Sequence, residues 1–79
     1  MPRYHLNVHN GHGSAIDEEG AEYSNLGAAR IAAVHGIRSF LSAEVLDGTL
    51  DLNGHLDIVD TEGVVVARVP FSDAVAVRP

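Results

Sequence analysis

The sequence predicts a small α+β domain in which one helix packs on a four-stranded antiparallel sheet, in the order ββαββ. Over residues 3–9 apolar and polar side chains alternate strictly, which is the pattern of a strand with one apolar and one polar face. Residues 55–59 alternate in the same way, whereas 26–46 carries apolar residues at helical spacing. An apolar sheet face must be covered, and this single amphipathic segment is able to cover it.

The first predicted hairpin begins with strand 3–9, whose side chains Tyr4, Leu6 and Val8 face the core. The residues between them, which include His5 and His9, face outward. The chain then continues through a glycine-containing turn, a short return strand, an acidic turn and a connector, at 10–13, 14–16, 17–20 and 21–24.

The predicted helix begins after Asn25, a residue type whose side chain accepts hydrogen bonds from the free amides of a first helical turn. It is expected to run to about Leu46 and to end at Asp47-Gly48. Its apolar stripe consists of Leu26, Ala29, Ala33, Val34, Ile37, Phe40 and Leu41.

The second predicted hairpin joins strands 55–59 and 64–69 through a turn that ends at Gly63. Leu56 and Ile58 are expected to face the core, together with Val65, Ala67 and Val69, while Arg68 faces outward. Pro70 ends the last strand, Phe71 folds back over the core, and 72–79 forms an edge strand or frays. A right-handed crossover between the hairpins predicts the strand order 2-1-3-4.

Length and composition limit the possible functions. The 79 residues form one domain, 1–79, and the chain has no cysteine, which excludes disulfides and thiolate metal sites. Eleven acidic residues face five arginines, and a net charge of −6 argues against nucleic-acid binding. The sequence shows neither an apolar run long enough to span a membrane nor a signal peptide, so we expect a cytoplasmic protein.

The histidines suggest a metal site only on a particular strand pairing. His5, His55 and Asp57 all face outward, and they would converge if the first and third strands are neighbours. The simpler interpretation, which we favour, is a solvated sheet face that binds no metal and no cofactor. No serine has an evident base and orienting acid, so we expect no enzymatic activity.

Arg30 falls within the apolar stripe of the predicted helix, where a guanidinium needs a partner. The acidic segment before the helix offers carboxylates. We therefore predict a structural ion pair between Arg30 and this segment, with Glu18, Glu19 and Glu22 as partners.

Two surfaces favour self-association. Small residues recur every fourth position on one helix flank, beside an outward-facing Ile31, and the last strand is apolar on both faces. A core this small also gains from a partner subunit. The residues predicted to form the interface are Ala28, Ile31, Ala32, Gly36, Val64 and Val66.

Several short motifs resemble a family of short uncharacterised bacterial proteins. The family typically begins MPRYFF-V and contains a D-x-x-G block, an A-A-R helix start and a V-P-F end. The corresponding segments are 1–4, 17–20, 28–30 and 69–71. His5 departs from the family, which usually has an aromatic residue there, as does Gly27, where glutamate is common. The resemblance implies a cytoplasmic, stand-alone bacterial domain and no particular activity.

The predicted function is that of a small, non-catalytic protein-interaction module. It is expected to form a homo-oligomer, specifically a homodimer. One alternative is an antitoxin-like or regulatory protein that neutralises a basic partner with its acidic surface, an idea that rests on architecture and charge alone. The other alternative is a histidine-based metal-binding protein. Another protein is the expected partner, with neither nucleic acid nor membrane involved.

Overall fold

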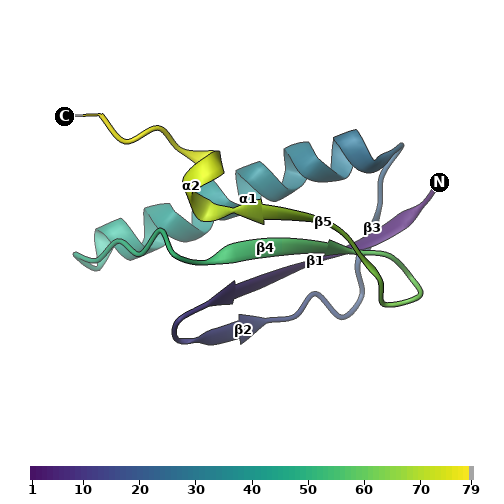
Figure 1. Ribbon diagram of the computed structural model, residues 1–79, viewed down its shortest axis with the longest axis horizontal. Helices are drawn as coiled ribbons and strands as arrows, with labels where there is room; N and C mark the ends of the chain where they lie inside the picture. Colours follow the sequence, from purple (N-terminus) through teal and green to yellow (C-terminus); the bar gives the residue numbers. More distant parts are fainter. Residues whose placement is uncertain (79) are drawn as a thin grey trace.

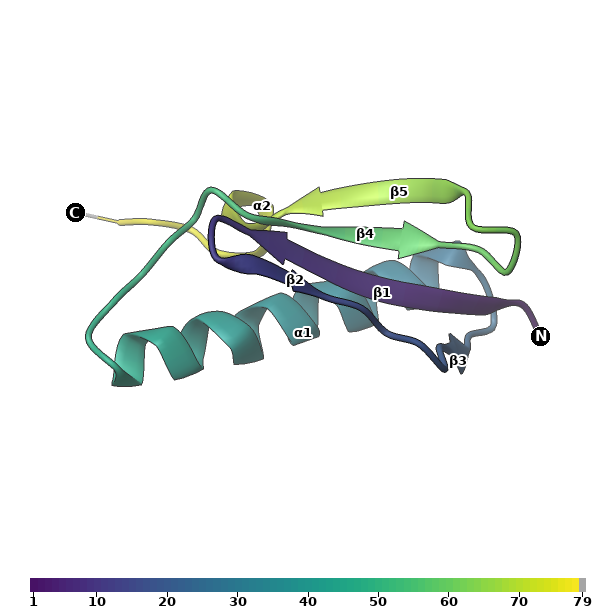
Figure 2. The same ribbon diagram turned by 90° about the horizontal axis from the view of Figure 1, so that it is seen from below.

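Helix α1 (Leu26–Leu46) lies along one face of an antiparallel sheet, as Figures 1 and 2 show. The computed structural model describes residues 1–78 and confirms the predicted α+β class. A second, short helix, α2 (Phe71–Ala74), follows the last strand. The strands are β1 (Arg3–Asn10), β2 (Gly13–Ala15), β3 (Ala21–Glu22), β4 (His55–Val59) and β5 (Val65–Pro70).

The strand order is β2-β1-β4-β5, so the predicted order 2-1-3-4 is confirmed, with β4 and β5 as its third and fourth strands. β1 and β4 pair antiparallel in the centre, with Leu6 opposite Ile58 and His9 opposite His55. The connector at 21–24 contains the additional strand β3, which pairs with the start of β1. β5 pairs with β4 and ends the order, so its other edge has no neighbouring strand among the described residues.

A β-bulge corrects one predicted orientation. Val65 was expected to face the core, but it is 48% exposed. The register shifts between Ile58 and Val59, so that Ala67 faces Ile58 while Val65 already faces Val59, and Val66 is the extra residue. Because an inserted residue breaks the alternation of sides, Val65 and Val66 at the start of β5 are both exposed, as is Val64 just before the strand.

The core lies between α1 and the sheet. The predicted helical stripe is confirmed, and Phe71 closes the core as expected, with no exposed surface. The tail does not form the edge strand considered from the sequence, since it begins with α2 and continues without regular structure through Arg78; Pro79 lies outside the described residues. The buried core residues are Ala29, Ala33, Ile37, Leu41, Leu56, Ile58, Val69, Phe71 and Ala74.

The ends of α1 match the sequence signals. Asn25 caps the helix by accepting a hydrogen bond from the backbone amide of Ala28 at 2.8 Å. The chain leaves the helix through Gly48, which has a positive φ of 86°. Within the described chain, no helix combines the length and the apolarity of a membrane span.

Candidate functional site

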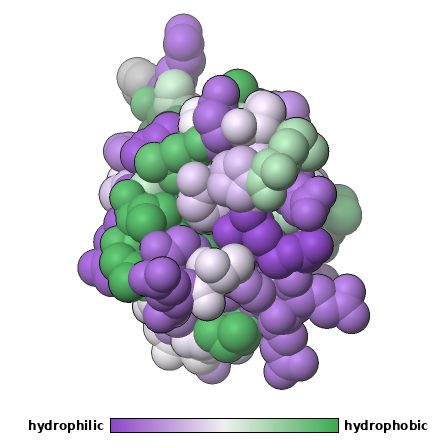
Figure 3. Space-filling view, turned by 90° about the vertical axis from the view of Figure 1, so that its right-hand side faces the viewer, coloured by the Kyte–Doolittle hydropathy of each residue, from purple (hydrophilic) through white to green (hydrophobic). Residues whose placement is uncertain are grey.

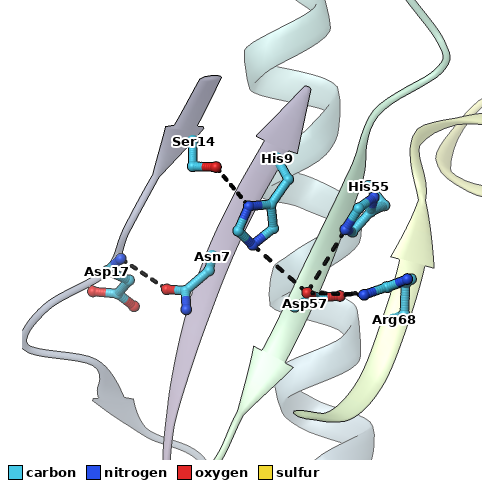
Figure 4. Close-up of polar contacts among 7 residues, drawn as sticks. All are labelled: Asn7, His9, Ser14, Asp17, His55, Asp57 and Arg68. Atoms are coloured by element: carbon cyan, nitrogen blue, oxygen red, sulfur yellow. Dashed lines mark hydrogen bonds and ion pairs between the residues drawn. The ribbon is translucent and has the colours of Figure 1, made fainter. Parts of the chain in front are cut away.

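The open face of the sheet carries a cluster of four polar side chains, His9, His55, Asp57 and Arg68, which we call the polar cluster (Figure 4). The alternation within β1, β4 and β5 turns these side chains away from α1. The register then brings them together, because it pairs His9 with His55 and Asp57 with Arg68.

Asp57 is the centre of the polar cluster and the only buried charged residue among those described, with 5% of its surface exposed. Arg68 donates to both of its carboxylate oxygens, from Nε to Oδ1 at 2.7 Å and from Nη2 to Oδ2 at 3.3 Å. This hydrogen bonding lowers the pKa of Asp57 below its ordinary value of 3.8, although burial acts in the opposite direction. The same contact raises the pKa of the Arg68 guanidinium.

The two histidines approach Asp57 from neighbouring strands. Nε2 of His9 lies 3.6 Å from Asp57 Oδ2, and Nε2 of His55 lies 3.7 Å from the same oxygen. The two imidazole rings are 5.2 Å apart between centroids. On its other side, Nδ1 of His9 is in hydrogen-bond contact with Oγ of Ser14 on β2, at 2.7 Å.

We predict that the folded protein loses stability in acid partly through Asp57. The pKa of this carboxyl is lower in the fold than in the unfolded chain, so its ionised form stabilises the fold above the unfolded pKa. That contribution disappears as the pH falls below about 4. Urea unfolding at a series of pH values should therefore show a flatter pH dependence for Asp57→Asn than for the wild type.

The exposed carboxyl of Glu62 provides the matched control, since it lies in the β4–β5 turn away from the polar cluster. Glu62→Gln is expected to keep the wild-type pH dependence of the free energy of unfolding. An unchanged acid slope in Asp57→Asn would contradict the assigned role of Asp57.

The order Ser14, His9, Asp57 resembles that of a nucleophile, a base and an orienting acid, a grouping that spacing along the chain does not reveal. The geometry differs from that of such a triad, because 3.6 Å between His9 and Asp57 is longer than a hydrogen bond. Asp57 is instead held by Arg68. What the cluster does offer is a set of metal-ligand atoms, since one from each of His9, His55 and Asp57 lies within 4.8 Å of the others.

The alternative grouping of His5 with His55 and Asp57 does not form, although the strand pairing that it required is present. The register places His5 opposite Val59, and its Nδ1 contacts the backbone oxygen of Asp17 at 2.6 Å. His9 takes its place as the residue opposite His55. The sequence contains one signal for this pairing. His9 stands just before the turn after β1, and His55 stands just after Gly54, where β4 begins. In an antiparallel pair these two positions lie at the same end of the sheet.

The predicted ion pair between Arg30 and the acidic segment is also wrong. Arg30 is exposed, and among residues 1–78 it forms no ion pair with Glu18, Glu19 or Glu22. Arg3 makes these contacts instead: it lies 3.8 Å from the carboxylate of Glu22 and donates to the backbone oxygen of Glu19 at 3.0 Å. Arg30 lies at the edge of the apolar stripe and not within it, so its guanidinium reaches water.

Asp17 fixes the acidic turn to β1. Its carboxylate accepts hydrogen bonds from the backbone amides of Leu6 at 3.2 Å and Gly20 at 3.1 Å, and its own amide donates to the side chain of Asn7 at 2.9 Å. Gly20 has a φ of 67°, and a Cβ there would lie 2.7 Å from the backbone oxygen of Tyr4. The carboxylate of Asp17 therefore binds backbone amides and not a cationic side chain, so a search for ion pairs in the sequence does not find its role.

The predicted interface residues are accessible to different degrees. Ile31 is 64% exposed, and Gly36 has open space around it. Val64, just before β5, and Val66, within it, are exposed, whereas Ala28 and Ala32 are partly buried. The structure thus leaves both predicted surfaces without a covering element among the described residues.

The comparisons with known proteins found one family. A model described as a domain of unknown function (DUF6894) matches residues 3–72. No curated protein and no solved structure matches the chain.

Proposed function

This chain belongs to the DUF6894 family, a domain of unknown function, and from its own geometry we propose that it is a small non-catalytic interaction module that forms a homodimer. The edge of β5 is the contact surface in this proposal. The observation that carries it is an open sheet edge that begins with two exposed valines, Val65 and Val66, directly after the exposed turn residue Val64.

The β5 edge differs from the opposite side of the sheet. Both outer strands of the sheet, β2 and β5, pair on one side only, but β2 has three residues and is followed by the turn that Asp17 holds, whereas β5 has six residues. Val64, Val65 and Val66 are 52%, 48% and 39% exposed. Figure 3 faces the end of the molecule that carries the β4–β5 turn and shows apolar surface there among hydrophilic surface.

Backbone chemistry indicates which kind of partner fits this edge. An edge strand presents free N–H and C=O groups, and another strand satisfies them most completely. Exposed edges usually carry charged residues that discourage pairing, but Arg68 is the sole charged side chain in β5 and it is held by Asp57. An antiparallel β5–β5 contact is self-complementary, as a two-fold homodimer requires. Pro70, which has no N–H, limits the pairing to the residues before it.

Two other apolar surfaces compete with this edge. One is the α1 flank around Ile31. The other is a groove of about 370 Å³ at the end of α1, bordered by Val45, Leu50 and Val77, all more than half exposed. The first surface lies on a helix, whose backbone groups are bonded within it, and the second lies between the helix end, a loop and the tail, so neither presents an open strand edge. We therefore use them as controls.

We predict that a lysine on the β5 edge abolishes dimerisation. An edge lysine blocks strand pairing, and in a symmetric contact Val66→Lys brings one positive charge from each chain into the interface. Because Val66 is exposed, the fold should tolerate the change. Sedimentation at micromolar concentration should show a dimer for the wild type and a monomer for the variant.

Ile31→Lys and Leu46→Lys are the matched controls, since both residues are exposed apolar side chains on α1. Both variants are expected to remain dimeric. A wild-type protein that stays monomeric, or a dimer that Ile31→Lys or Leu46→Lys dissociates while Val66→Lys does not, would refute the proposed edge contact.

Ionic strength separates this proposal from binding to a basic partner. Two copies with a net charge of −6 each repel one another, so salt should strengthen self-association by screening. Binding of an acidic surface to a basic protein would weaken as salt rises. The sedimentation series should therefore be run at low and at high salt.

A further inference from the structure

We propose that His9, His55 and Asp57 bind a divalent transition-metal ion of the zinc class on the open face of the sheet. This inference is independent of the dimer, because the three side chains come from β1 and β4 of one chain. The residues are brought together by strand register alone: His9 stands opposite His55, and Asp57 lies two residues further along β4 on the same face.

The distances between ligand atoms fit a tetrahedral ion. Bonds of about 2.0–2.1 Å from zinc to imidazole nitrogen and carboxylate oxygen place neighbouring ligand atoms roughly 3.4 Å apart. Asp57 Oδ2 lies 3.6 Å from Nε2 of His9 and 3.7 Å from Nε2 of His55, and the ligand atoms of the three residues all lie within 4.8 Å of one another. Small side-chain rotations close this difference, and both imidazoles are only partly buried and so free to make them.

The donor set selects the class of ion. Two imidazole nitrogens and one carboxylate oxygen suit zinc and its neighbours in the first transition row, whereas calcium and magnesium take oxygen ligands. Three protein ligands leave at least one position open. A surface pocket of about 210 Å³, lined by His9, His55 and Gly54 among others, lies beside the histidines and has room for water or another ligand.

The neighbouring groups orient two of the ligands. Arg68 donates to Oδ1 of Asp57 at 2.7 Å and to Oδ2 at the longer distance of 3.3 Å, and Oδ2 is the oxygen that lies near both imidazoles. When Nδ1 of His9 carries its proton, it donates to Ser14 Oγ, and the lone pair of Nε2 then points toward Asp57. Such partners of the ligands are typical of metal sites in proteins.

The same arginine limits the affinity. The positive charge of Arg68 lies beside Asp57 and opposes a dication at Oδ2. In the described part of the chain, every buried side-chain nitrogen or oxygen already has a hydrogen-bond partner, so the fold does not need the ion. We therefore expect a metal-free protein that is folded and an ion that adds stability when it binds.

Titration calorimetry of the tag-free, metal-free chain with Zn²⁺ tests the site. We expect one ion per chain, and we expect His9→Gln and His55→Gln each to weaken binding at least about tenfold. His35→Gln is the matched control, because His35 is an exposed histidine on α1, and it should bind as the wild type does. Circular dichroism confirms that each variant is folded.

Co²⁺ provides a second readout on the unaltered chain, which decides the matter if a variant does not fold. Paramagnetic shifts should appear at the imidazole signals of His9 and His55 and not at those of His35. Absence of stoichiometric binding would overturn the proposal, and so would equal weakening by His35→Gln or paramagnetic shifts centred on another histidine.

Discussion

Phe71→Ala is expected to lower the free energy of unfolding by about 3–5 kcal/mol, the range for removing a fully buried aromatic ring. Phe71 has no exposed surface, and its ring packs against that of Phe40 at 5.6 Å between centroids. Its backbone amide also donates to the oxygen of Gly54 at 3.0 Å, so the ring is fixed where the chain enters β4. A domain of this length has a total stability of roughly 4–12 kcal/mol, so the variant is expected to be mostly unfolded at the low end of that range.

Urea denaturation followed by circular dichroism measures this loss. Val77→Ala is the control, because Val77 is 76% exposed, and its substitution should change the free energy of unfolding by no more than about 0.5 kcal/mol. If Phe71→Ala unfolded at the wild-type urea midpoint, Phe71 would not close the core.

Gly54→Ala is expected to be the second most damaging change, at about 1–3 kcal/mol or more. A Cβ at Gly54 would overlap the ring of Phe71 and lie 2.7 Å from the backbone oxygen of His9. Neither neighbour can withdraw, since the ring fills the core and the oxygen belongs to a central strand. Only a residue without a side chain lets the chain pass between β1 and Phe71.

Gly36 is the matched glycine. A Cβ at Gly36 meets nothing within 4 Å, so Gly36→Ala should raise the stability of the monomer by up to about 1 kcal/mol through helix propensity. Thermal unfolding of both variants should move the midpoints in opposite directions. A neutral Gly54→Ala would show that the entrance to β4 is wider than described.

Local patterns were sufficient to predict α1, the four strands of the main sheet order and most of their faces, but not β3, α2 or the exposed position of Val65. The alternation in β1 identified the strand and its buried side, because neighbouring side chains on a strand must face opposite ways. Asn25 and Gly48 identified the ends of α1 by the backbone groups that they satisfy or by the φ that they permit. Phe71 was identified as a core residue from its position after Pro70.

The candidate site depended on register, which alternation does not determine. A slip of one residue would turn a strand inside out, but His5 and His9 are four residues apart and face the same side. The alternation in β1 is therefore compatible with either His5 or His9 lying opposite His55. The choice is made by Gly54, which packs against the backbone of His9 and so fixes where β4 begins.

The errors at the bulge and at Arg30 have separate causes. Three valines in succession give no alternation, so the sequence cannot show which one is inserted, and the register of β4 with β5 decides. Arg30 was assigned by helical phase and by the presence of nearby carboxylates. Helical phase gives the direction of a side chain only to within a broad arc around the helix. The acidic segment is already in contact with another arginine, Arg3.

Amide hydrogen exchange measured below and above the dimerisation concentration is the most direct test of the central claim, that the chain associates through the free edge of its sheet. We predict that exchange slows on dimerisation for β5 amides and stays constant along the α1 flank from Ala28 to Gly36. Slowing confined to α1, or β5 amides that exchange at one rate at every concentration, would contradict it.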